Sequence, residues 1–125
     1  MPSFYGAWRT LCVAQFFVML AIYIGLGVAK NPGAVVGDFN DLLMHFSGYV
    51  VAGISIGFAF GKRSAAWRFL VLFLFSTGIE CIQYTLPWRS FDLRDIAANT
   101  LGVLLGLLCW WVGYYLFKRF TGPRS

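Results

Sequence analysis

The sequence predicts an all-α integral membrane protein, a single domain over residues 1–125 built as a bundle of four transmembrane helices. Apolar side chains make up 59% of the chain and charged side chains only 12%, whereas about 25% of the residues in a soluble domain are charged. Four apolar runs are each about 20 residues long, which is enough to cross a bilayer. None of them alternates with period two, so a transmembrane β-barrel is disfavoured.

The four runs predict helices over residues 10–29, 42–60, 68–87 and 95–117. At a rise of about 1.5 Å per residue, each run reaches about 30 Å, the thickness of the hydrocarbon core. The first run is too long for the apolar region of a cleaved signal peptide, and no convincing cleavage site follows it. We therefore expect it to remain attached as a membrane anchor.

Cations are concentrated in three segments that a four-helix topology places on one side of the membrane. The N-terminal segment, the second connection and the C-terminal tail hold seven of the ten Lys and Arg residues and none of the five acids. These seven are Arg9, Lys62, Arg63, Arg68, Lys118, Arg119 and Arg124. Because positively charged loops remain in the cytoplasm, we expect both termini to be cytoplasmic. The formal net charge of +5 is then mainly a topology signal, and we expect no nucleic-acid partner.

Glycines recur every four residues on the second and fourth predicted helices. Gly53, Gly57 and Gly61 lie on the second helix, and Gly102 and Gly106 on the fourth. Such rows of small residues let helix backbones approach closely within a membrane. We interpret them as packing contacts within one chain, with a homodimer interface as the alternative.

Cofactor and disulfide motifs are missing from the sequence. The three cysteines, Cys12, Cys81 and Cys109, all lie in apolar runs, and none belongs to a CxxC pair. The chain also has no CxxCH motif and no glycine-rich phosphate loop after a strand. We therefore expect no disulfide and no cofactor.

Polar side chains occur at helical spacing near the outer ends of three predicted helices. The members of each pair are three or four residues apart, so they share a helix face. The helical rise places the deepest of them, Glu80, about 12 Å below the outer interface. We expect a shared polar pocket that opens to the outer face, with a purely structural hydrogen-bond network as the alternative. The pairs are Asp41 with His45, Glu80 with Gln83, and Asp95 with Asn99.

A carboxylate at the depth of Glu80 costs a few kcal/mol unless it is paired, hydrated or protonated. His45, Arg89 and Arg94 are its candidate partners. His45, Glu80 and Asp95 are the candidate catalytic groups, because imidazole and carboxyl groups serve as acids and bases. Arg89 and Arg94 have the fork geometry that binds phosphate or carboxylate.

A metal variant of this pocket is an alternative. Asp41, His45, Glu80 and Asp95 offer one nitrogen and several oxygens to a divalent cation. No compact ligand motif supports such a site, so the sequence by itself predicts no metal.

Two stretches of the sequence resemble motifs of VanZ-like membrane proteins. The first runs from Asp41 to His45 and is followed by Tyr49; it has Leu42 where the family often has Lys. The resemblance implies a small bacterial inner-membrane protein of the cell envelope. The family's namesake is associated with resistance to teicoplanin, a function that the resemblance does not transfer to this chain. The second motif comprises Glu80, Gln83, Pro87, Arg89, Asp92, Asp95, Asn99, Gly102 and Gly106.

Three functions fit these observations, and the sequence leaves open whether any of them is enzymatic. The first is a pocket that binds or processes the head group of an amphipathic molecule, such as a lipid-linked cell-envelope intermediate. The second is a non-enzymatic subunit or assembly factor of a larger membrane complex, with aromatic side chains of the first and fourth helices facing the partner. The third, a dimeric proton-coupled exporter, is disfavoured because the polar cluster is skewed to one face.

Overall fold

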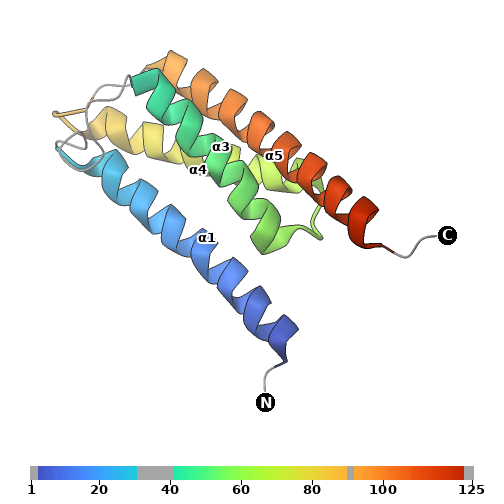
Figure 1. Ribbon diagram of the computed structural model, residues 1–125. Coiled ribbons are helices and arrows are strands. Elements are labelled where there is room, and N and C mark those ends of the chain that lie inside the picture. The colour runs from blue at the N-terminus through green and yellow to red at the C-terminus, as the bar shows by residue number, and fades with distance from the viewer. Residues whose placement is uncertain (1–2, 31–40, 90–91, 123–125) are drawn as a thin grey trace.

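The computed structural model describes residues 3–30, 41–89 and 92–122, and within these ranges all regular structure is helical (Figure 1). Helix α1 spans Phe4–Val28, α3 spans Asp41–Phe60, α4 spans Ala65–Thr85 and α5 spans Leu93–Thr121. All four are long and apolar enough to cross a membrane. The predicted fold class, an all-α bundle of four membrane-spanning helices, is confirmed.

Three helices begin earlier than their apolar runs because a polar side chain caps each first turn. The side chains of Ser3, Ser64 and Asp92 accept hydrogen bonds from backbone N–H groups at the starts of α1, α4 and α5. Such caps satisfy donors that have no partner inside the helix. As a result, Arg68 lies inside α4 and is 8% exposed, so its assignment to the connection before this helix is wrong.

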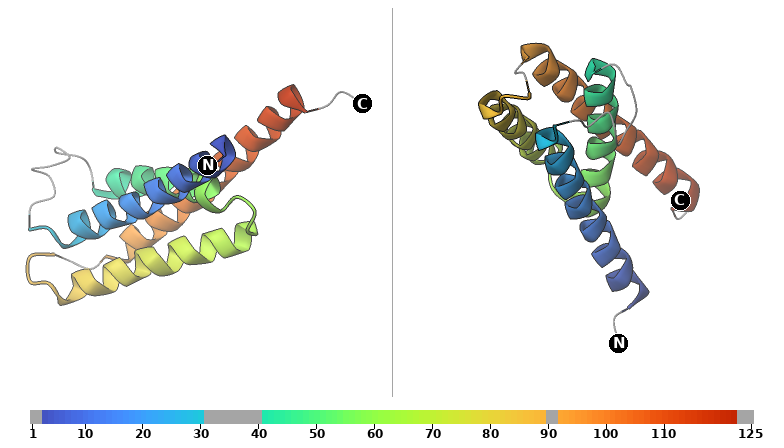
Figure 2. Two further views of the ribbon diagram at one scale, coloured as in Figure 1. Left: turned by 90° about the horizontal axis from the view of Figure 1, so that it is seen from below. Right: turned by 90° about the vertical axis from the view of Figure 1, so that its left-hand side faces the viewer.

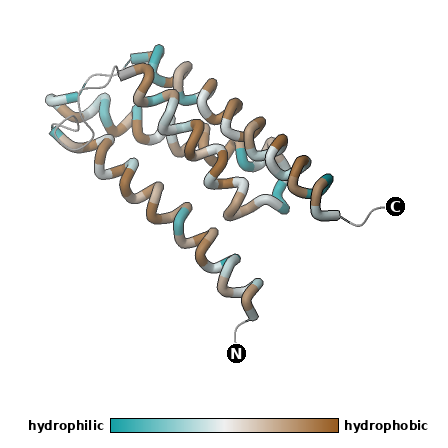
Figure 3. The backbone as a smooth tube through the Cα atoms, viewed as in Figure 1, coloured by the Kyte–Doolittle hydropathy of each residue, from teal (hydrophilic) through white to brown (hydrophobic). Residues whose placement is uncertain are grey.

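Successive helices run in opposite directions, which gives the bundle two distinct ends (Figures 1 and 2). The terminal end holds the start of α1, the turn between α3 and α4, and the end of α5. The loop end holds the end of α1, the start of α3, the end of α4 and the start of α5. Hydrophilic residues are concentrated at these two ends, whereas the helices between them are mostly apolar (Figure 3).

Helix α3 lies between the other helices, and its closest neighbour is α5. A Cβ atom added at Gly102 or Gly106 would overlap the carbonyl oxygen of a residue in α3, and one added at Gly53 would lie 2.8 Å from the Cα of Gly106. The backbones of α3 and α5 therefore touch directly at Gly53, Gly102 and Gly106. A Cβ atom at Gly57 would instead overlap the indole ring of Trp110.

Side chains from all four helices form the apolar core around α3. Helix α1 is also held by polar contacts, since Ser55 Oγ donates a hydrogen bond of 2.7 Å to Gln15 Oε1. Toward the terminal end α1 diverges from the other helices (Figure 1). The buried core residues are Phe16, Met19, Tyr49, Ala52, Ile56, Ala59, Leu72 and Val103.

Candidate functional site

Polar side chains of three helices meet at the loop end of the bundle. His45 lies in the second turn of α3, Asp95 and Asn99 lie in the first two turns of α5, and Glu80 lies near the end of α4. Since α3 and α5 begin at this end and α4 ends there, the antiparallel topology brings residues far apart in sequence to one depth.

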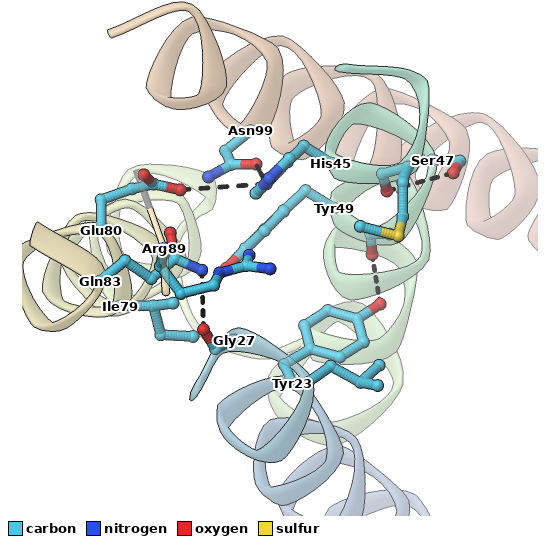
Figure 4. Close-up of a pocket in the computed structure, with 13 residues that line it drawn as sticks. Tyr23, Gly27, His45, Ser47, Tyr49, Ile79, Glu80, Gln83, Arg89 and Asn99 are labelled. Atoms are coloured by element: carbon cyan, nitrogen blue, oxygen red, sulfur yellow. Dashed lines mark hydrogen bonds and ion pairs between the residues drawn. The ribbon is translucent and has the colours of Figure 1, made fainter. Parts of the chain in front are cut away.

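His45 is at the centre of this cluster. Its Nδ1 lies 3.0 Å from Asn99 Oδ1 and 4.0 Å from Glu80 Oε1 (Figure 4). Its Nε2 lies 3.7 Å from Asp95 Oδ2. An amide oxygen only accepts hydrogen bonds, so the contact with Asn99 requires a proton on Nδ1. In the neutral imidazole, Nε2 then carries the lone pair.

Glu80 is the most completely buried ionisable residue of the cluster. Its side chain is 0% exposed, and neither carboxyl oxygen has a hydrogen-bond partner among the residues that the structure describes. A buried charge without a partner costs several kcal/mol, so such groups normally bind a proton or a cation. This environment therefore favours a bound proton or a positively charged neighbour or ligand at Glu80.

A cavity of about 250 Å³ lies directly beside the cluster, between α1, α3 and α4 (Figure 4). Arg89, from the segment after α4, extends into it. The cavity is amphipathic, because its remaining walls carry both polar and apolar side chains. The polar ones include His45, Glu80, Gln83 and Asn99, and the apolar and aromatic ones include Tyr23, Leu26, Met44, Tyr49 and Ile79.

Gln83 has a structural contact inside this cavity. Its Nε2 donates a hydrogen bond of 3.0 Å to the carbonyl oxygen of Gly27, and Trp88 Nε1 donates one of 2.9 Å to that of Val28. The last carbonyls of a helix lack partners within the helix. Gln83 and Trp88 therefore provide hydrogen bonds to the last carbonyl groups of α1 and hold the end of α1 against the end of α4.

Asp92 and Arg94 do not line the cavity. They pair with each other on the surface, with 3.0 Å between Arg94 Nη2 and Asp92 Oδ2. Hydrogen bonds from the side chain and backbone of Arg94 lower the pKa of the Asp92 carboxyl group. Arg94 is thus not brought to Arg89 as a second anion-binding group. The side chain of Asp41 lies outside the part of the chain that the structure describes.

The sequence interpretation missed the contribution of α1 to the site. The aromatic side chains of the first helix were expected to face a partner protein, yet the hydroxyl of Tyr23 donates a hydrogen bond to the carbonyl of Gly48 at the cavity wall. The sequence does indicate such a contact, because a tyrosine hydroxyl in an apolar segment needs a polar partner. Within the same helix Phe16 is 2% exposed and Phe17 is 55% exposed, so one of these two is in the core and the other on the surface.

Fold and site together define a small multi-pass membrane protein with an amphipathic cavity beside a buried cluster of acids and a histidine. Residues 44–117 match the VanZ/LLP1 family, and the chain belongs to this family. The matched range includes His45, Glu80, Arg89 and Asn99.

A fungal protein is also similar to the chain. "Uncharacterized protein C11E3.10" of Schizosaccharomyces pombe (strain 972 / ATCC 24843) is 34% identical over 113 residues, which covers 86% of this chain and 68% of the relative. No solved structure matches the chain significantly.

Proposed function

We propose that the protein binds the anionic head group of an amphipathic molecule, such as a lipid-linked cell-envelope intermediate, in the cavity at the loop end. The observation that carries this proposal is the position of Arg89, whose guanidinium enters a cavity with both polar and apolar walls. An amphipathic cavity with one inserted cation matches a ligand with an anion at one end and a hydrocarbon chain at the other.

Each wall of the cavity has a distinct role in this proposal. Arg89 forms a bidentate contact with a phosphate or carboxylate group, the geometry for which guanidinium is suited. His45 and Glu80 lie on the same side and act as acid–base or hydrogen-bonding groups toward the head group. Leu26, Met44 and Ile79 contact the first carbons of the chain.

The size of the cavity limits what it encloses. At about 250 Å³ it is slightly below the range of about 300–1,000 Å³ typical of pockets for whole small molecules. It therefore holds a head group and the start of the chain, while the rest of the chain lies in the bilayer along the apolar helix surfaces.

Binding of dodecyl phosphate to the full-length protein in mild detergent tests this proposal. We expect Arg89→Ala to weaken binding about 10- to 100-fold, because a charge-assisted contact is worth about 1.5–3 kcal/mol. Arg94→Ala is the matched control, since Arg94 lies at the same end but pairs with Asp92 outside the cavity. Equal binding by wild type and Arg89→Ala, or binding by neither, would contradict the proposal.

We also propose that the protein lies in a bacterial inner membrane with both termini in the cytoplasm, so that the cavity faces outward. The exposed cations Lys62, Arg63, Lys118 and Arg119 at the terminal end support this orientation. In a variant without Cys81 and Cys109, a membrane-impermeant maleimide should label Pro87→Cys in intact cells and Ala65→Cys only after permeabilisation. The opposite labelling pattern would show that the protein has the opposite orientation in the membrane.

A further inference from the structure

We propose that His45, Glu80 and Asp95 form a binding site for one divalent transition-metal ion, Zn²⁺ or Mn²⁺, at the edge of the head-group cavity. Each of these residues offers one ligand atom, and the three atoms all lie within 4.8 Å of one another. Ligands around a tetrahedral ion at about 2.1 Å are about 3.4 Å apart. Side-chain movements of about 1 Å therefore bring the cluster to coordination distance.

The orientation of His45 suits a metal ligand. Because Nδ1 donates its proton to Asn99 Oδ1 at 3.0 Å, the lone pair of the neutral ring is on Nε2. That nitrogen faces Asp95 Oδ2 at 3.7 Å. Metal-binding histidines usually donate their other ring N–H to a carbonyl or carboxylate, which fixes the ring orientation. Asn99, which is 1% exposed, supplies this contact here.

The burial of Glu80 independently supports a cation site. Its carboxyl group points toward His45, is fully buried, and has no hydrogen-bond partner among the described residues (Figure 4). His45 Nδ1 lies 4.0 Å from Glu80 Oε1 and donates to Asn99 instead, so it gives the carboxylate no hydrogen bond. A divalent cation between Glu80 and Asp95 neutralises both carboxylates and supplies the partner that the buried oxygens lack.

The ligand set indicates the class of ion. Imidazole favours Zn²⁺ and related transition metals, and carboxylates favour harder ions such as Mn²⁺. Three protein ligands leave at least one coordination position open. In our proposal this position faces the cavity and binds an oxygen of the anionic head group opposite Arg89, a role that rests on the proposed function. The metal site itself rests only on the geometry of the three side chains.

Metal retention by the purified full-length protein tests the inference. The protein is stripped with a chelator in mild detergent, incubated with Zn²⁺ or Mn²⁺, dialysed and analysed by mass spectrometry for bound metal. We expect one ion per chain in the wild type and at least 100-fold weaker binding in Asp95→Asn and Glu80→Gln. Asn99→Leu should weaken binding about 10- to 100-fold, as expected for a residue that orients a ligand.

Asp92→Asn is the matched control, because it removes a nearby carboxylate that pairs with Arg94 outside the cluster; it should bind metal as the wild type does. Asp95 is 14% exposed, so Asp95→Asn is informative even where Glu80→Gln fails to fold. Failure of the wild type to retain an ion, or retention undiminished in Asp95→Asn, would overturn the inference and leave His45 as the counter-charge of the two acids. A wild type that binds dodecyl phosphate but retains no metal ion would overturn this inference alone, whereas metal retention without dodecyl phosphate binding would contradict only the proposed function.

Discussion

At the loop end of the bundle, Glu80, Gln83 and Asn99 are each at most 1% exposed and face a cavity of about 250 Å³. At the terminal end, by contrast, the cations of the 61–64 turn and of the last turn of α5 are exposed. The cavity there is larger, about 940 Å³, and many of its lining residues are aromatic. The polar residues of the two ends are therefore arranged differently: at the loop end they are buried around a cavity, and at the terminal end the charged ones lie on the surface.

The contact between α3 and α5 explains this difference between the ends. From the loop end to the middle of the bundle the two backbones touch, at Gly102, Gly106 and Gly53, and in the same stretch His45 lies within hydrogen-bonding distance of Asn99. Near the terminal end the indole of Trp110 separates α5 from Gly57. The helices are thus held closest together where the polar side chains must meet.

The largest effect on stability is expected from Gly102→Ala, which adds a methyl group where the backbones of α3 and α5 touch. Its Cβ would overlap the carbonyl oxygen of Phe46 and lie 3.0 Å from the Cβ of Tyr49. Backbone atoms cannot move aside cheaply, so we expect a loss of about 1–3 kcal/mol in the free energy of unfolding. Thermal unfolding in mild detergent measures this loss.

Gly113→Ala is the control for that substitution, because nothing lies within 4 Å of a Cβ added there. Alanine is the better helix former, so this variant should unfold at the wild-type temperature or slightly above it. A Gly102→Ala protein as stable as Gly113→Ala would show that the loop end is no more tightly packed than the rest of α5.

A smaller effect is expected from Gly57→Ala at the terminal end. Its Cβ would overlap the indole of Trp110, and a side chain can rotate away where a backbone cannot. We expect a loss of about 1 kcal/mol, in the lower part of the range for overpacked cores. The double variant Gly57→Ala with Trp110→Leu should lose less stability than the sum of the two single variants. Strict additivity would mean that Trp110 does not separate the helices at this end.

The smallest effect is expected from Asp92→Asn at the loop end. Asparagine still caps α5, so the substitution removes only the charge of the pair with Arg94. Because Arg94 lowers the pKa of Asp92 in the folded protein, the charged pair stabilises the fold above the pKa of the unfolded chain. This stabilisation is lost as the pH falls through the folded pKa. The difference in unfolding temperature between wild type and variant should therefore be small at pH 7 and vanish in acid; a constant difference would exclude the pair as its cause.

Hydropathy and helical spacing predicted most of the fold and the position of the polar cluster. A run of about 20 apolar residues fixes a span within a few residues, and spacings of three or four place two side chains on one face. These signals predict that Glu80, His45 and Asn99 lie at one end of the bundle. The actual starts of α1, α4 and α5 were missed because a single capping side chain contributes little to average hydropathy.

Contacts between helices were harder to predict, because spacing within one helix does not determine which neighbour a side chain meets. Gln83 shares a face with Glu80, yet its amide contacts the end of α1. Arg94 is close to Arg89 in sequence, yet a partner two residues away holds its guanidinium outside the cavity. Pairs between residues close in sequence form at little entropic cost. They compete with the contacts between distant residues that the sequence analysis predicts.

His45 is the chain's only histidine. In a sample labelled with ¹⁵N, a single pair of imidazole ring resonances therefore reports on the centre of the site. Tautomer, protonation and ligation each give a different pattern of ring nitrogen shifts. The occupancy of the site can accordingly be followed by solid-state NMR in native-like membranes, with the unsubstituted protein as its own probe.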